Sequence, residues 1–215
     1  QSVQSEGVIN LFTDVDKDFN LFNTAFMEEI SKMPEKNLSI ELLKKLIAEQ
    51  VRIYKRTNIV KSQQFSEILN KIVKSYLNGL LTNEQVISEL IKMAQDIANA
   101  HQTGNAMGLS DEELAFYDAL CVNDAAVKIM GDEILKKIAH DLADSIRKSI
   151  TIDWKLKESV RARMRTTIKG LLRKYGYPPD QQDAAVKTVM EQAELMCENE
   201  SYEIDESFGL GMVAE

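Results

Sequence analysis

The sequence predicts an all-α fold of about eight helices in two packed helical sub-bundles. Apolar residues recur at three- and four-residue intervals through most of the chain, which is the spacing of one helix face. No alternation of apolar and polar residues lasts four residues between turn signals, so no strand is expected. The 215 residues include nine Gly and only three Pro, and so few helix breakers favour long helices.

Four helices are expected in the first half of the chain, over residues 18–33, 38–57, 60–78 and 82–102. Pro34 ends the first of them, and Gly79 stands where a left-handed C-cap belongs. Thr82 and Gln85 form the capping-box pattern that opens the fourth. Residues 1–13 lack this periodicity and are expected to fray.

Residues 103–109, TGNAMGL, are interpreted as a linker between two domains. Ser110 and Glu113 form a second capping box, and Asn123 starts a short helix that breaks near Gly131.

Three further helices follow in the second half. Asp132 is expected to cap a helix that runs to about residue 150. Asp153 is expected to cap the next helix, which ends at Gly176. The inward residues of the first are expected to be Ile134, Leu135, Ile138, Leu142 and Ile146. Residues 178–179, both Pro, start the last helix, which is expected to end near Glu198.

The predicted organisation has five parts: a lead-in over 1–13, a helical region over 14–102, the linker over 103–109, a helical domain over 110–198 and an acidic tail over 199–215.

Only two stretches of this acidic chain carry a net positive charge. The net charge is −8, yet residues 38–74 carry +5 and residues 147–174 carry +8. Within the second stretch, basic residues recur every four positions, at Lys157, Arg161, Arg165, Lys169 and Arg173. We expect this basic stripe to face outward, opposite an apolar face made by Leu156, Val160, Met164, Ile168, Leu171, Leu172 and Tyr175.

Like charges spaced in this way repel, so carboxylates or phosphates must lie beside them. The flanking segments 109–146 and 175–215 carry −6 and −9, enough for internal salt bridges. Internal pairing and contact with nucleic acid or an acidic partner therefore both explain the basic stripe.

No catalytic apparatus is predicted. The sequence lacks phosphate-binding glycine motifs, and no nucleophile has a base near it in sequence. His140 precedes Asp141 and Asp144, but a single His with two carboxylates is a weak metal signal, and a surface histidine is the preferred interpretation.

Three acidic residues, Glu112, Glu113 and Asp118, could be paired catalytic acids. Their position after Ser110 is better explained by helix capping and by the helix dipole.

The aromatic residues are ambiguous. Trp154, Tyr175 and Tyr177 could stack on bases, although packing is the preferred explanation for Trp154 and Tyr175. Phe116 and Tyr117 are adjacent, so one ring must point away from the buried face unless a neighbour covers it.

The two cysteines, Cys121 and Cys197, each fall in an apolar helical pattern, and reduced, half-buried thiols in a cytoplasmic protein are expected. No apolar run has the length of a membrane span and no signal peptide is visible. Because the chain does not begin with Met, we expect it to be either processed or cut from something longer, and the second is preferred.

Five stretches together are specific enough to suggest a family. They are KNLSIELLKKLI (36–47), RTNIVKSQQFSEILNK (56–71), MGLSDEELAFYDAL (107–120), TIDWKLKESVRARMRTTIKGLLRKYGYPPD (151–180) and AAVKTVMEQAE (184–194). In this order they resemble the C-terminal region of the R, or motor, subunit of type I restriction–modification enzymes. The resemblance covers about residues 30–196.

The resemblance implies that the parent subunit is a site-specific deoxyribonuclease that translocates DNA with ATP and magnesium. This chain would be the helical region that follows the motor domains, over 14–102, and the assembly domain, over 110–198. It implies no catalytic residue, metal or cofactor in this chain. The implied partners are the methyltransferase and specificity subunits and the phosphate backbone of double-stranded DNA, with no membrane.

The resemblance favours contact over purely internal pairing for the basic residues. Candidate contacts with DNA or a partner are Lys157, Arg161, Arg163, Arg165, Lys169, Arg173 and Lys174, and more weakly Lys55, Arg56 and Lys61. The alternative is a pure protein–protein docking module without DNA contact. About five phosphate contacts would give a slope of log affinity against log salt concentration of roughly −4 to −5. Docking on a protein would give a far shallower slope.

Overall fold

A computed structural model describes residues 24–149 and 158–209, with side chains over 26–149 and 158–198, and these residues form helices without strands. The chain divides into two compact units. One comprises the described residues up to Ala48 together with Leu69–Asn99, and the other comprises Glu49–Ile68 together with the described residues from Ala100 onward. Each unit is described by itself.

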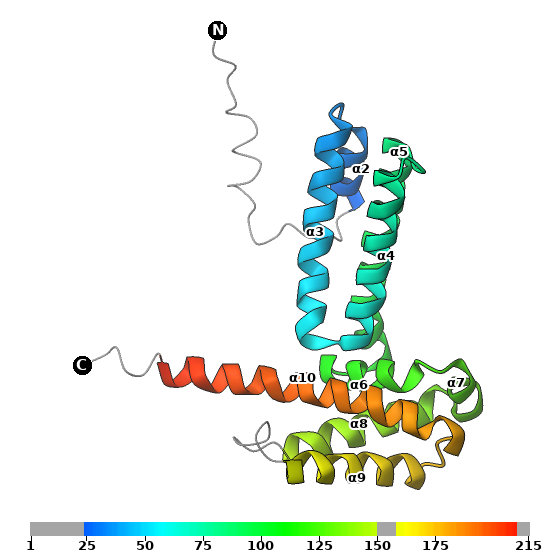
Figure 1. The fold of residues 1–215 in the computed structure, drawn as a ribbon, viewed down its shortest axis with the longest axis vertical. Coiled ribbons are helices and arrows are strands. Elements are labelled where there is room, and N and C mark those ends of the chain that lie inside the picture. Colours follow the sequence, from blue (N-terminus) through cyan, green and yellow to red (C-terminus); the bar gives the residue numbers. More distant parts are fainter. Residues whose placement is uncertain (1–23, 150–157, 210–215) are drawn as a thin grey trace. The chain divides into compact units, whose positions relative to one another are not determined.

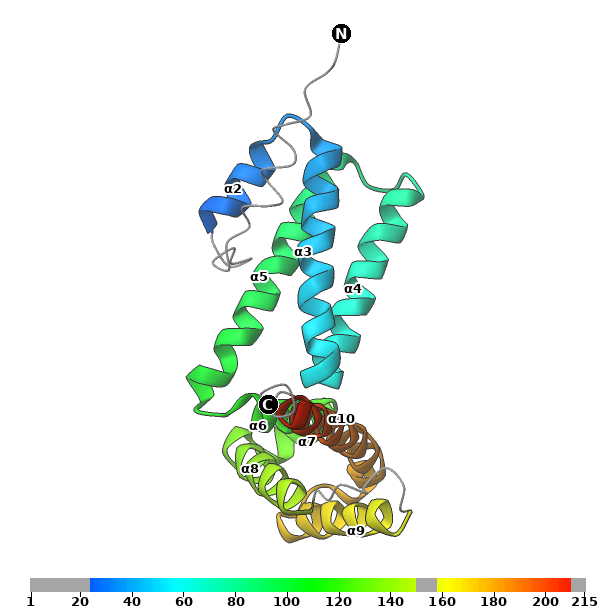
Figure 2. The same cartoon turned by 90° about the vertical axis from the view of Figure 1, so that its left-hand side faces the viewer.

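The first unit holds α2 (Thr24–Lys32) and parts of three longer helices, α3 (Lys36–Thr57), α4 (Ile59–Leu77) and α5 (Asn83–Met107). Within it the three long helices run side by side (Figures 1 and 2). Their apolar faces bury Met27, Ile30, Ile40, Leu43, Ile47, Ile72, Val86, Ile87, Leu90, Met93, Ala94 and Ile97.

The glycine end predicted at Gly79 and the capping box predicted at Thr82 are confirmed. Gly79 has a φ of 69°, as a left-handed C-cap requires. The hydroxyl of Thr82 accepts from the Gln85 amide at 3.3 Å, while the Gln85 side chain accepts from the Thr82 amide at 2.9 Å. The expected first helix is seen from Thr24, and residues 18–23 of that expectation lie outside the described residues.

The linker expected over 103–109 is wrong for most of its length, because α5 continues to Met107. Gly104 does not break the helix; it is buried, and a Cβ added to it would lie 2.9 Å from Cδ2 of Leu114. The glycine therefore allows α5 to pack closely against Leu114 of α6. Only Gly108, with a φ of 70°, Leu109 and the N-cap Ser110 separate the two helices.

The second unit adds five α-helices and a 3₁₀ turn. They are α6 (Asp111–Cys121), α7 (Asp124–Met130), α8 (Asp132–Ser149), α9 (Glu158–Lys174), η1 (Pro179–Gln181) and α10 (Gln182–Gly209). Helix α8 packs against α6 and α9, and α10 packs against the same two helices (Figures 1 and 2). Their shared core includes Phe116, Leu120, Leu135, Ile138, Leu142, Met164, Ile168, Leu172, Tyr177 and Val189.

The expected caps are present where α6 and α7 begin and where α7 and α9 end. Ser110 and Glu113 form the full capping box of α6, and the Asn123 side chain caps α7. Gly131 and Gly176 both have a φ of 73°. The cap expected at Asp153 and the ring of Trp154 lie outside the described residues.

Two expectations for α8 are wrong. Asp132 is its first residue and not a cap before it, and the carboxylate accepts from the Tyr117 hydroxyl at 2.9 Å. Ile134 is 39% exposed. Every fourth residue advances by about 40° around a helix, which carries position 134 out of the buried stripe that includes Leu135 and Ile138.

The last helix is longer than expected, since α10 runs to Gly209 and does not end near Glu198. Residues 199–208 contain neither Pro nor Gly, so no breaker interrupts the helix before Gly209. Residues 210–215 of the predicted tail lie outside the described residues. No helix in the described part of the chain has the length and apolarity needed to cross a membrane.

Candidate nucleic-acid interface

The basic stripe does not lie on one side of α9. Met164, Ile168 and Leu172 are buried, as expected for the apolar face. Basic residues every four positions advance by about 40° per step, so the stripe starts near the buried face at Arg161 and reaches solvent at Arg173. Lys157 lies outside the described residues.

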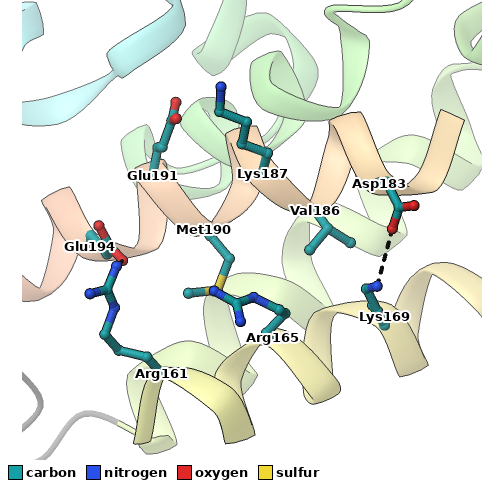
Figure 3. Close-up of a pocket in the computed structure, with 9 residues that line it drawn as sticks. All are labelled: Arg161, Arg165, Lys169, Asp183, Val186, Lys187, Met190, Glu191 and Glu194. Atoms are coloured by element: carbon teal, nitrogen blue, oxygen red, sulfur yellow. Dashed lines mark hydrogen bonds and ion pairs between the residues drawn. The ribbon is translucent and has the colours of Figure 1, made fainter. Parts of the chain in front are cut away.

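Two cations of the stripe face α10 and are paired with its carboxylates. Nη2 of Arg161 lies 2.6 Å from Oε1 of Glu194, and Nζ of Lys169 lies 3.1 Å from Oδ1 of Asp183 (Figure 3). The internal-pairing interpretation therefore holds for these two residues.

A third cation pairs on the opposite side of α9, with α8. Nζ of Lys174 lies 3.1 Å from Oδ2 of Asp141 and 4.8 Å from the centroid of the Tyr175 ring. The same carboxylate oxygen accepts from the Tyr175 hydroxyl at 2.8 Å. The hydrogen bonds from Tyr175 and Lys174 lower the pKa of Asp141, and the bond from Tyr175 has the larger effect. Tyr175 is half-buried in this contact, which supports packing for its ring.

Three arginines of α9 have no such partner. Arg163, Arg165 and Arg173 are exposed, and none forms an ion pair with a side chain that the structure describes. Their guanidinium groups are therefore available to an external anion.

A groove of about 430 Å³ lies between α9 and α10. Its lining residues are Arg161, Arg165, Lys169, Asp183, Val186, Lys187, Met190, Glu191 and Glu194. Val186 and Met190 are buried apolar residues at its base. Figure 3 shows Arg165 reaching toward Met190, between the Arg161–Glu194 and Lys169–Asp183 pairs. We call this the α9–α10 groove.

The weaker basic cluster is only partly exposed. Lys55 and Arg56 lie on the surface of α3, but Nζ of Lys61 lies 3.7 Å from a carboxylate oxygen of Asp118. The Asn58 amide also donates to Asp118, at 2.7 Å. Burial raises the pKa of Asp118, although Lys61 and Asn58 oppose that shift. Lys61 is thus committed to a contact inside the chain.

A buried glutamine beside this cluster was not predicted. Gln192 of α10 is 2% exposed, and its side-chain amide donates to the carbonyl of Thr57 at 2.9 Å. Its side-chain oxygen accepts from the backbone N–H of Ile59, also at 2.9 Å. One side chain therefore ties the end of α3 and the start of α4 to α10. The available signal was a polar residue between Val189 and Met196 on the apolar face of the last helix.

The acidic residues of α6 have structural partners. Glu113 completes the capping box, as expected, and Glu112 forms an ion pair with Arg147. Asp118 is not a capping residue, because it lies in the last turns of α6 and faces Asn58 and Lys61. Within the described residues, no three His, Cys, Asp or Glu side chains gather as a metal site requires.

His140 is on the helix surface, as expected, but it has a close partner. Its Nδ1 lies 2.5 Å from Oε1 of Glu113, and Asp144 adds a contact at 3.9 Å. The hydrogen bond to the Glu113 carboxylate raises the pKa of His140 and, from the other side, lowers the pKa of Glu113. The pair links α8 to the first turn of α6.

This pair predicts a pH dependence of stability. Because the folded-state pKa of His140 is raised, its contribution is complete below the unfolded-state pKa and is lost as the pH rises through the folded-state value. In the unaltered chain we expect the urea midpoint to fall between about pH 6 and about pH 9, and a His140→Gln variant to show a smaller fall. Equal pH profiles for the two proteins would contradict the assignment.

The remaining aromatic and cysteine side chains pack. Phe116 is fully buried in the core of the second unit. Its neighbour Tyr117 is half-buried and packs against the same core. Tyr177 is 1% exposed and its hydroxyl donates to the Leu120 carbonyl at 3.0 Å, so it does not stack on bases. Cys121 is half-buried, whereas Cys197 is fully buried and not half-buried as expected.

Comparison with known proteins gives a consistent family. The family model of the C-terminal region of type I restriction enzyme HindI endonuclease subunit-like proteins matches residues 1–199. The type I restriction enzyme HindI endonuclease subunit of Haemophilus influenzae is 40% identical over 202 residues, which are 93% of this chain and 19% of the relative. A putative type I restriction enzyme MjaIXP endonuclease subunit of Methanocaldococcus jannaschii is 28% identical over 180 residues, 82% of this chain and 17% of the relative.

The chain thus spans about a fifth of the length of the curated relatives it matches. No solved structure gives a significant match.

Proposed function

Since the chain belongs to the family of C-terminal regions of HindI-like type I restriction endonuclease subunits, we propose that it is a non-catalytic assembly and DNA-contacting region of such a subunit. In this proposal the parent is a cytoplasmic ATP- and magnesium-dependent translocase and endonuclease. This region helps to hold it on the methyltransferase and specificity subunits, and its α9 cations contact DNA phosphates.

The observation that carries the DNA contact is a set of three exposed arginines on α9, Arg163, Arg165 and Arg173, which form no ion pair within the described residues. Guanidinium groups suit phosphate because they present several donors in a fixed plane. Such contacts neutralise the backbone and do not read bases, so the proposed binding is independent of sequence.

A docking module without DNA contact is the second candidate. It is favoured by the apolar base of the α9–α10 groove, Val186 and Met190, and by the carboxylates on its α10 side. A mixed polar rim around a buried apolar centre is typical of a protein–protein interface.

The dependence of duplex affinity on salt separates the two candidates. We would titrate a 30-base-pair duplex of arbitrary sequence with this chain and follow fluorescence anisotropy at several salt concentrations. Contact of three to five cations with phosphates predicts a log–log slope between about −3 and about −4.5. Undetectable binding at low salt would reject the DNA contact and leave the docking function.

A further inference from the structure

The α9–α10 groove holds cations and carboxylates in an order that suggests competition. Along α9, Arg165 lies between Arg161 and Lys169, which are both paired, and it has no ion-pair partner in the part of the chain that the structure describes. The carboxylates of these pairs, Glu194 and Asp183, come from the facing helix α10 (Figure 3). Three successive members of the basic stripe thus line one groove, and two of them are paired with carboxylates of the same chain.

Both ion pairs are open to solvent. The side chains of Arg161 and Glu194 are 42% and 31% exposed, and those of Lys169 and Asp183 are 38% and 90% exposed. Exposed pairs of this kind contribute only about 0–1 kcal/mol each to stability. A polyanion can therefore replace these carboxylates at small cost.

The Arg161 pair is also incomplete. Glu194 accepts a hydrogen bond from Nη2 of the guanidinium, while the buried Nε of Arg161 has no hydrogen-bond partner among the described residues. A bidentate pair would use two parallel donors and would be harder to displace.

We infer that Asp183 and Glu194 are built-in competitors for DNA phosphate: they occupy Lys169 and Arg161 in the free protein and release them to the duplex. This inference rests on the proposed function, since it concerns how the same cations are regulated. Arg163, Arg165 and Arg173 make the first contacts with phosphates. Arg161 and Lys169, which we call the masked cations, add contacts only when phosphates displace Glu194 and Asp183.

The masking has a measurable signature. When Arg161 or Lys169 leaves its carboxylate for a phosphate, the DNA releases a salt cation, but the freed carboxylate attracts one from solution, so the net release is small. The unaltered chain is therefore expected to show a slope close to that of Arg163, Arg165 and Arg173 alone, about −3. With both carboxylates removed, five cations count, and the slope becomes about −4.5.

The test variant is Asp183→Asn with Glu194→Gln, in the whole chain. Its matched control is Glu89→Gln with Asp96→Asn, two exposed acids of α5 for which no ion pair is found in the described structure. Both double variants change the net charge by the same amount, so the control measures the nonspecific effect of charge on duplex affinity.

At about 0.1 M salt we expect the test variant to bind the 30-base-pair duplex about tenfold more tightly than the control variant, with the steeper slope. Equal affinities and slopes for the two variants, with the unaltered chain still binding, would overturn the masking and leave the proposed function standing. Absence of binding in all three proteins would overturn both. Binding by the test variant alone would support the competition by Asp183 and Glu194, but it would overturn the first contacts assigned to Arg163, Arg165 and Arg173.

Discussion

Changing Arg161, Arg165 and Lys169 together to Glu is expected to weaken duplex binding at least about a hundredfold at about 0.1 M salt. The three residues line one groove, so the substitutions replace its cations by carboxylates facing those of α10. Repulsion of phosphate then adds to the lost contacts. The measurement is anisotropy with the 30-base-pair duplex.

The matched control is Lys71→Glu with Lys74→Glu and Lys92→Glu. These lysines are exposed on α4 and α5, and the triple substitution changes the net charge by the same amount. We expect the affinity of the control variant to fall less than about tenfold, because only the overall electrostatic potential of the protein has changed. Equal losses in the two triple variants would show that total charge, and not the α9–α10 groove, determines binding.

Replacing Gln192 by Met is expected to lower the free energy of unfolding by about 2–3 kcal/mol. Met has a similar length and shape, but it cannot donate to the Thr57 carbonyl or accept from the Ile59 N–H. Both backbone groups lie at helix ends, where no intrahelical partner replaces the lost bond. Urea unfolding followed by circular dichroism measures the change.

Gln102→Met is the control for that experiment, because the Gln102 side chain is exposed on α5 and makes no hydrogen bond within the described residues. A surface substitution of this kind changes stability by about 0.5 kcal/mol or less. If Gln192→Met lowered the free energy of unfolding no more than Gln102→Met, Gln192 would not tie α10 to the junction of α3 and α4.

Much of the fold follows from local sequence signals. The capping boxes at Thr82 and Ser110 and the glycine ends at Gly79 and Gly176 depend on residues within one helical turn, so the sequence predicts them well. Gly104 was misinterpreted because its role is set by Leu114, which packs on it from another helix. A glycine that breaks a helix and one that permits close packing look alike in sequence.

The candidate site was less predictable than the fold. The four-residue spacing in α9 identified the basic residues, but it did not reveal which of them meet carboxylates. That depends on how α10 lies along α9, which places Asp183 near Lys169 and Glu194 near Arg161. Gln192 was missed for the same reason, since its partners are backbone groups more than a hundred residues away in sequence.

The most direct test of the central claim observes the α9 arginines while DNA binds. The chain has only seven arginines, four of them on α9, so the Nε–H signals of a ¹⁵N-arginine sample form a simple spectrum. On addition of the 30-base-pair duplex, we predict shifts for Arg163, Arg165 and Arg173 but none for Arg52, which is paired with Glu49 on α3. Unchanged α9 signals at a duplex concentration that saturates binding would contradict the claim.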